Sequence, residues 1–188
     1  MARPRSDDKR TAIMLAAARV VATQGLGAAT ATIAKEAGVS NGSLFTYFDT
    51  KADLFNQLYL ELKSDMGAAA FGGMPAGDDP REQMLHMWSQ WLRWATAYPE
   101  KRRALAQLDV SDEIATSTHE IASRAMAGIA GVLERSRANG PMRDAPLGFV
   151  VALANALAET TIDFIIRDPD NAQMHGRVGF DALWRMIA

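Results

Sequence analysis

Apolar residues recur at spacings of three and four along almost the whole chain, and this periodicity constrains the fold most strongly. Such spacing places the apolar side chains on one face of an α-helix. No stretch of six or more residues alternates between apolar and polar types, as a half-buried strand would. Alanine, which has the highest helix propensity, is also abundant. The sequence therefore predicts an all-α fold.

Glycine, proline and capping residues divide the chain into successive helices. Gly25 and Gly38 are suited to follow the first two helices, and Ser40 is a good N-cap for the third. The clearest interruption is the segment rich in glycine and proline at residues 67–80. We expect helices at residues 6–24, 30–37, 41–48, 51–66, 81–98, 99–108, 111–138, 147–167 and 171–187.

Composition narrows the protein class. Of the 188 residues, 48% are hydrophobic and 22% are charged, which is typical of a globular protein. The chain has no cysteine, which excludes disulfides, thiolate metal sites and a cysteine nucleophile. The longest apolar stretch, residues 149–158, is shorter than a membrane span, and the polar N-terminus lacks the apolar segment of a signal peptide. We therefore expect a soluble, cytoplasmic protein with no membrane partner.

Residues 30–48 carry the most informative motif. Two short helices are expected to be joined by a tight turn at residues 38–40, which is typical of a helix-turn-helix. The small and apolar residues suited to that helix crossing are Ile33, Ala34, Ala37, Val39 and Leu44. In DNA-binding proteins the second helix of this motif enters the major groove. A helical hairpin in an ordinary bundle can show the same pattern, and the net charge of −2 does not favour DNA.

About 45 residues at the N-terminus resemble the tetracycline-repressor (TetR/AcrR) family of transcriptional regulators. The family's first-helix pattern matches residues 13–25, and its second pattern matches residues 33–48, followed by Lys51 and Leu54. The rest of the chain agrees with the family only in being helical and of suitable length. The resemblance implies an N-terminal three-helix helix-turn-helix domain and a C-terminal helical bundle for ligand binding and dimerisation.

This organisation gives four expected segments. The helix-turn-helix DNA-binding domain would occupy residues 1–50, and a connecting helix residues 51–66. The Gly/Pro-rich loop at 67–80 would lead into a helical ligand-sensing and dimerisation domain at 81–188.

The resemblance also implies which side chains meet double-stranded DNA. Asn41 could pair with adenine, and Ser43 and Thr46 could reach base edges or phosphates. Tyr47 and Lys51 match positions that hold the DNA backbone. The expected DNA-binding residues are Thr30, Ser40, Asn41, Gly42, Ser43, Phe45, Thr46, Tyr47 and Lys51.

The chain departs from the family pattern in two places. Phe45 stands where the family usually has tyrosine, so one hydroxyl contact to phosphate is in doubt. The segment from Gly25 to Ile33 is one residue shorter than usual, which leaves either Ala29 or Thr30 as the N-cap of the second helix. Arg3 and Arg5 could form an arm over the duplex, although short basic termini are often disordered.

The helix expected at residues 81–98 is rich in methionine and aromatic residues. Such a stripe usually forms protein core, but adaptable methionines and aromatic walls also suit an apolar effector. Both interpretations stay open. The candidate ligand-binding residues are Met84, Met87, Trp88, Trp91, Trp94 and Tyr98, with Met126, Phe149 and Phe164 as the opposite wall.

The last two long helices carry extensive apolar stripes. The resemblance implies that they form a homodimer interface, which would place two recognition helices on a near-palindromic operator. We therefore expect a sequence-specific transcriptional regulator, a repressor released from its operator by a small apolar or aromatic effector. An all-helical enzyme or ligand carrier, and a DNA-binding regulator without an effector, are the alternatives.

Catalytic and metal motifs give little support to an enzyme. Residues 38–42 match the G-x-S-x-G pattern of serine hydrolases, but a helix rather than a strand precedes them. His86, His119 and His175 lack the spacing of metal ligands. We expect no catalytic residues, no metal and no cofactor.

Overall fold

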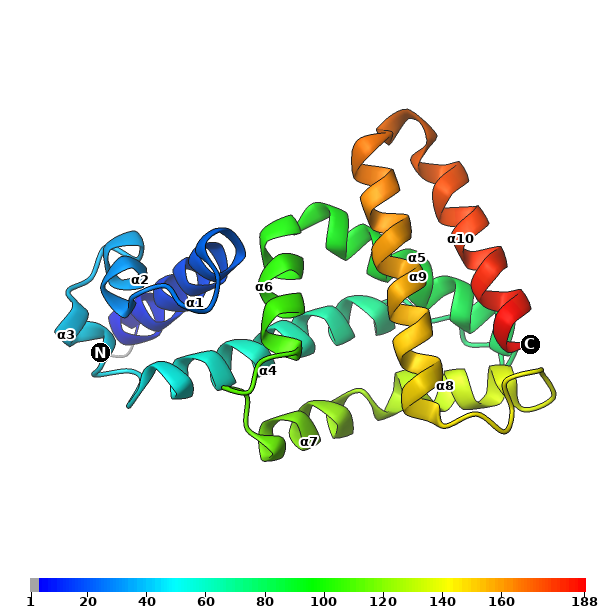
Figure 1. Cartoon of the computed structure of the whole chain (residues 1–188), viewed down its shortest axis with the longest axis horizontal. Helices are drawn as coiled ribbons and strands as arrows, with labels where there is room; N and C mark the ends of the chain where they lie inside the picture. Colours follow the sequence, from blue (N-terminus) through cyan, green and yellow to red (C-terminus); the bar gives the residue numbers. More distant parts are fainter. Residues whose placement is uncertain (1–3) are drawn as a thin grey trace. The chain divides into compact units, whose positions relative to one another are not determined.

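The computed structural model describes residues 4–188, with side chains from Asp7 onward, and every regular element in this range is a helix (Figure 1). The all-α expectation is confirmed. The proposed arm lies outside this description, because neither Arg3 nor the Arg5 side chain is included. The helices are α1 (Pro4–Gln24), α2 (Thr30–Glu36), α3 (Asn41–Leu44), α4 (Lys51–Phe71), α5 (Pro80–Ala97), α6 (Pro99–Asp109), α7 (Thr116–Ala125), α8 (Ala127–Arg137), α9 (Leu147–Arg167), the 3₁₀ turn η1 (Pro169–Asn171) and α10 (Ala172–Ile187).

Contacts group the chain into two compact units. The first contains the chain up to Ser64 together with Tyr98–Ser123, and the second contains Asp65–Ala97 and Arg124–Ala188. The first unit thus contains the helix-turn-helix together with most of α4, all of α6 and most of α7. In this first unit α1 packs against α2 and α6, and α2 packs against α3.

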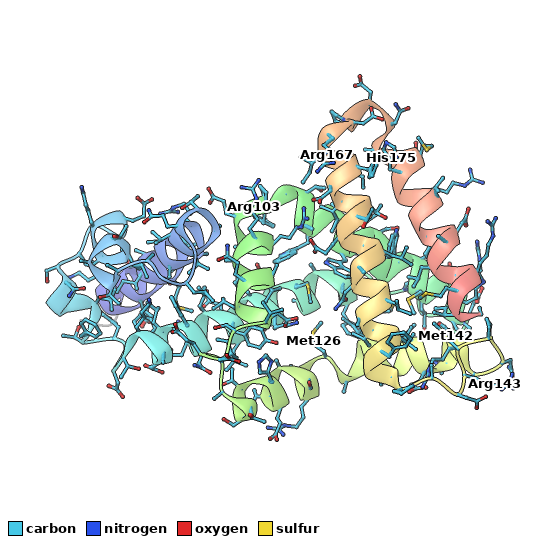
Figure 2. All side chains as sticks on the ribbon, viewed as in Figure 1. Arg103, Met126, Met142, Arg143, Arg167 and His175 are labelled. Carbon is cyan, nitrogen blue, oxygen red and sulfur yellow. The ribbon has the colours of Figure 1, made fainter. Side chains whose placement is uncertain are left out.

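Two helix boundaries in the middle of the chain differ from the prediction. Helix α4 continues to Phe71, although residues 67–71 were expected in the loop. The expected helix at 111–138 is instead two helices, α7 and α8, separated at Met126. Within the second unit Met126, which is labelled in Figure 2, packs on Gly67. A Cβ at Gly67 would lie 2.9 Å from the Met126 sulfur, so this glycine serves close helix packing rather than a turn.

Helices α5, α8, α9 and α10 build the second unit. Helices α9 and α10 lie side by side as an antiparallel pair, and both pack against α5 (Figure 1). A Cβ at Gly179 would lie 2.9 Å from Cζ2 of Trp88 and closer still to Oγ1 of Thr161. The missing side chain at Gly179 therefore lets α10 approach both neighbours closely.

Candidate nucleic-acid interface

The turn between α2 and α3 has the local structure that its residues favour. Gly38 adopts φ +68°, a left-handed conformation that glycine tolerates best. The Val39 N–H donates to the Ala34 carbonyl at 2.9 Å, which closes the end of α2. Ser40 is the N-cap of α3, and its Oγ accepts a hydrogen bond from the Ser43 N–H at 3.1 Å. These bonds fix the direction in which α3 leaves the turn.

One side of α3 and the turn that follows it is buried, and the other side is exposed. Leu44 and Phe48 are 0% and 1% exposed and anchor the segment in the first unit. The opposite side is formed by the exposed residues Asn41, Gly42, Phe45 and Thr46, which we call the exposed α3 face. All four were predicted to meet DNA, and the structure brings them together on one surface.

The hydroxyl groups near this face are partly engaged within the protein. The Thr46 hydroxyl donates to the Ser43 carbonyl at 2.7 Å, so its hydrogen points to the backbone rather than to solvent. Its oxygen can still accept a hydrogen bond from a base amino group. Ser43 and Tyr47 are only partly exposed. Asn41 is therefore the polar side chain of the exposed α3 face that can both donate and accept freely.

Lys51 and Thr30 flank the motif. The Lys51 ammonium donates to the Leu26 carbonyl at 2.6 Å and lies 5.2 Å from the centre of the Phe55 ring. It thereby ties the start of α4 to the loop after α1, and its role as a phosphate ligand stays a prediction. Ala29 is the N-cap of α2, with no side-chain hydrogen bond, and Thr30 is the first helical residue. This resolves the register that the sequence left open.

Several interhelical contacts that hold the motif were not predicted from the sequence. The Arg19 guanidinium pairs with Glu36 at 2.9 Å and joins α1 to α2. Arg10 donates to Gln57 Oε1 at 2.9 Å and joins α1 to α4. The Gln107 amide donates to the Val21 carbonyl at 3.0 Å and joins α6 to the end of α1. Polar residues on separate helices carry no periodic pattern that would pair them in advance.

A polar cluster joins α4, α6 and α7 in the same unit. The Tyr59 hydroxyl donates to Asp109 Oδ1 at 2.8 Å and lies 3.1 Å from Nδ1 of His119. Lys63 pairs with the same Asp109 oxygen at 2.8 Å. Burial, together with the hydrogen bond and charge of Asp109, raises the pKa of Tyr59 well above its usual value. Burial alone would raise the pKa of Asp109, but Lys63 and the Tyr59 hydroxyl bring it below its usual value. The sequence singled out only His119 of this group.

The candidate ligand residues divide into buried and exposed groups. Trp88 donates its indole N–H to the Gly176 carbonyl at 2.9 Å, and Trp94 donates to Asp65 Oδ2 at 3.2 Å. Both indoles are buried, so they have the properties of core residues. Met84 and Met87 are buried as well, whereas Trp91 and Met126 are partly exposed and Tyr98, Phe149 and Phe164 are about half exposed. The structure does not bring the nine residues into one enclosed cluster.

Comparison with known proteins agrees with this architecture. Residues 13–58 match the model of the tetR family of bacterial regulatory proteins. A tetR-family transcription regulator structure from Shewanella sp. PV-4 is 26% identical with a TM-score of 0.83, covering 94% of this chain and 96% of that one. A TetR-family structure from Marinobacter aquaeolei VT8 is 21% identical with a TM-score of 0.88, covering 99% and 98%.

A more distant match is the fatty acid degradation regulator FadR from Bacillus halodurans. It is 16% identical with a TM-score of 0.67 and covers 93% of this chain and 96% of that one. The family match assigns residues 13–58 to the tetR family of bacterial regulatory proteins, and the fold of TetR-family regulator structures is shared along nearly the whole chain.

Proposed function

We propose that this protein is a DNA-binding transcriptional regulator of the TetR family that binds a near-palindromic operator as a homodimer joined through α9 and α10, and that it is a repressor released by a small apolar or aromatic effector. The observation that carries the proposal is that α9 and α10 expose five large apolar side chains. They are between 46% and 58% exposed: Phe149, Phe164, Ile166, Met174 and Val178. We call these residues the α9–α10 apolar surface.

The α9–α10 apolar surface is too apolar to face water. Helix α9 is long and apolar enough to cross a membrane, although the apolar stretch at residues 149–158 alone is too short. An 18-residue segment of α9 has a mean hydropathy of 1.7, and only 22% of this segment is buried within the chain. An exposed patch of this kind on a soluble protein marks an interaction site. A second copy of the chain can bury this surface, because a twofold axis places the α9–α10 pair of one copy against the same pair of the other.

A twofold dimer determines how DNA is bound. It presents two copies of the exposed α3 face, which would enter successive major grooves about 34 Å apart. Each half-site would then have the same sequence in opposite orientation. Within each half-site Asn41 contacts base edges, while Tyr47, Lys51 and Thr30 lie toward the backbone.

The effector would act in the second unit by changing the separation of the two recognition helices. Partly exposed Trp91 and Met126 are the best placed of the candidate residues to meet it. Because two distinct sites are linked, an effector that lowers DNA affinity must itself bind more weakly to the DNA complex. The buried, hydrogen-bonded indoles of Trp88 and Trp94 favour the second candidate, a DNA-binding regulator without an effector.

The dimer is tested by placing a charge on the α9–α10 apolar surface. Val178, which is 58% exposed, is changed to glutamate, and Ser117→Glu on α7 adds the same charge outside that surface as a control. Light scattering after size exclusion should show a dimer for the wild type and Ser117→Glu, and a monomer for Val178→Glu. A monomeric wild type would refute the proposed interface.

Effector binding is tested separately by tryptophan fluorescence. The wild-type protein is titrated with a panel of fatty acids and planar aromatic compounds. A saturable change with one class, accompanied by loss of DNA binding, supports the repressor proposal. A flat response to the whole panel favours the regulator without an effector.

A further inference from the structure

Phe45 is an aromatic ring on a surface otherwise suited to polar contacts. It is 40% exposed, although its neighbours Leu44 and Phe48 are buried almost completely. It follows Asn41 by four residues and Gly42 by three, so on a helical turn it lies beside both. Apart from its chain neighbours, a Cβ added at Gly42 would meet nothing within 4 Å. The space beside Gly42 is therefore open, and the Phe45 ring is partly exposed on the same face.

The backbone beneath this ring is held firmly. The Phe45 N–H donates to the Asn41 carbonyl at 3.4 Å, and the next N–H, that of Thr46, donates to the Ser43 carbonyl at 3.1 Å. Leu44 and Phe48 are anchored in the core on either side. Since a preorganised backbone loses little freedom on binding, an exposed ring at this position is suited to recognition.

The chemistry of a phenyl ring limits what it can contact in DNA. It has no hydrogen-bond donor or acceptor, so it cannot bond to a phosphate or to the polar atoms of a base edge. In the major groove, the apolar group that a base edge offers is the C5-methyl group of thymine. The neighbouring Thr46 directs its hydroxyl hydrogen to the Ser43 carbonyl, not outward beside the ring.

From these observations we infer that Phe45 contacts the methyl group of a thymine in each operator half-site and thereby contributes to sequence specificity. The inference rests on the proposed operator binding and assigns a base to one residue of the exposed α3 face. The absence of a side chain at Gly42 leaves open space on the exposed α3 face beside Phe45. The departure from the family's usual tyrosine would then exchange a hydroxyl contact to phosphate for an apolar contact to a base.

The test removes that methyl group and nothing else. A preferred duplex is first selected from a random-sequence pool with the full-length wild-type protein. Each thymine of the half-site is then replaced singly by deoxyuridine, which lacks only the C5-methyl group. Burial of one methyl group predicts that one of these replacements weakens wild-type binding about fourfold, with the others near neutral.

The same duplexes are titrated with Phe45→Ala and Phe45→Tyr at low salt, where phosphate contacts keep weakened variants measurable. Phe45→Ala should bind the thymine and deoxyuridine duplexes equally, whereas Phe45→Tyr, which keeps the ring, should still prefer thymine. Circular dichroism controls for folding.

Loss of sensitivity in Phe45→Ala alone supports the assignment. A selected half-site in which no thymine is sensitive, or a Phe45→Ala variant as sensitive as the wild type, overturns it while leaving operator binding intact. Failure of the wild type to select any sequence overturns the operator proposal as well.

Discussion

Substitution of Gly179 by alanine tests whether the tryptophan-rich part of the second unit is tightly packed core. The new Cβ would lie 2.9 Å from Trp88 Cζ2 and 3.0 Å from Thr161 Cγ2, closer than normal van der Waals contact. Neither neighbour can move freely, because Trp88 is bonded to the Gly176 carbonyl and Thr161 Oγ1 to the Leu157 carbonyl at 2.7 Å. The substitution therefore forces strain into a hydrogen-bonded site.

The magnitude follows from two opposing effects. Overpacking typically costs about 1–3 kcal/mol, and the restrained neighbours place this site toward the upper end. Alanine in a helix interior regains about 1 kcal/mol relative to glycine. The expected net loss is about 1–2 kcal/mol in the free energy of unfolding. For a chain of this size this corresponds to a fall in Tm of about 3–6 °C.

Gly176→Ala in the same helix is the matched control. Its Cβ would lie 3.4 Å from Leu92 Cδ1, which is near ordinary contact, so we expect an unchanged or slightly raised Tm. Scanning calorimetry of both variants at one protein concentration provides the comparison. If Gly179→Ala is as stable as Gly176→Ala, the space around Trp88 can accept extra atoms, and the assignment of Trp88 to tightly packed core is wrong.

Three further predictions concern individual hydrogen bonds. Ser40→Ala removes the cap of α3 and should destabilise the protein by about 1 kcal/mol in urea unfolding and weaken DNA binding. Asn56→Ala removes bonds to the Glu113 carbonyl and the Ala115 N–H, both at 2.9 Å, so amide exchange at residues 113–116 should accelerate. The hydrogen bonds from His175 and Asn171 lower the pKa of Asp168, so its stabilising effect is present above about pH 4 and is lost as the pH falls through that lowered pKa. Asp168→Asn should therefore lower the Tm at neutral pH, with a difference from wild type that narrows below about pH 4.

Much of the helix-turn-helix could be predicted because its geometry is encoded locally. Gly38 has the positive φ expected of a residue that ends a helix, and Ser40 caps α3 as predicted. Alternation of buried and exposed positions around Leu44 then defines the exposed α3 face. Each of these features depends on residues no more than a few positions apart.

Features that depend on tertiary packing were not predictable in the same way. Gly67 resembles a helix terminator in sequence, yet it lies inside α4, where Met126, far along the chain, packs on it. The division of α7 from α8 at Met126 has no proline or glycine at the break itself. The sequence likewise could not decide whether Trp88 lines a pocket, since its hydrogen bond to Gly176 joins two helices distant in the chain.

The most direct test of the central claim is the salt dependence of DNA binding by the full-length wild-type protein. Fluorescence anisotropy would compare the selected duplex with a shuffled duplex of the same composition between about 50 and 200 mM salt. We expect the affinity for the selected duplex to fall steeply and linearly on a double-logarithmic plot, and to exceed that for the shuffled duplex by about a thousandfold or more. Equal affinity for the two duplexes, or no binding even at low salt, would contradict the account.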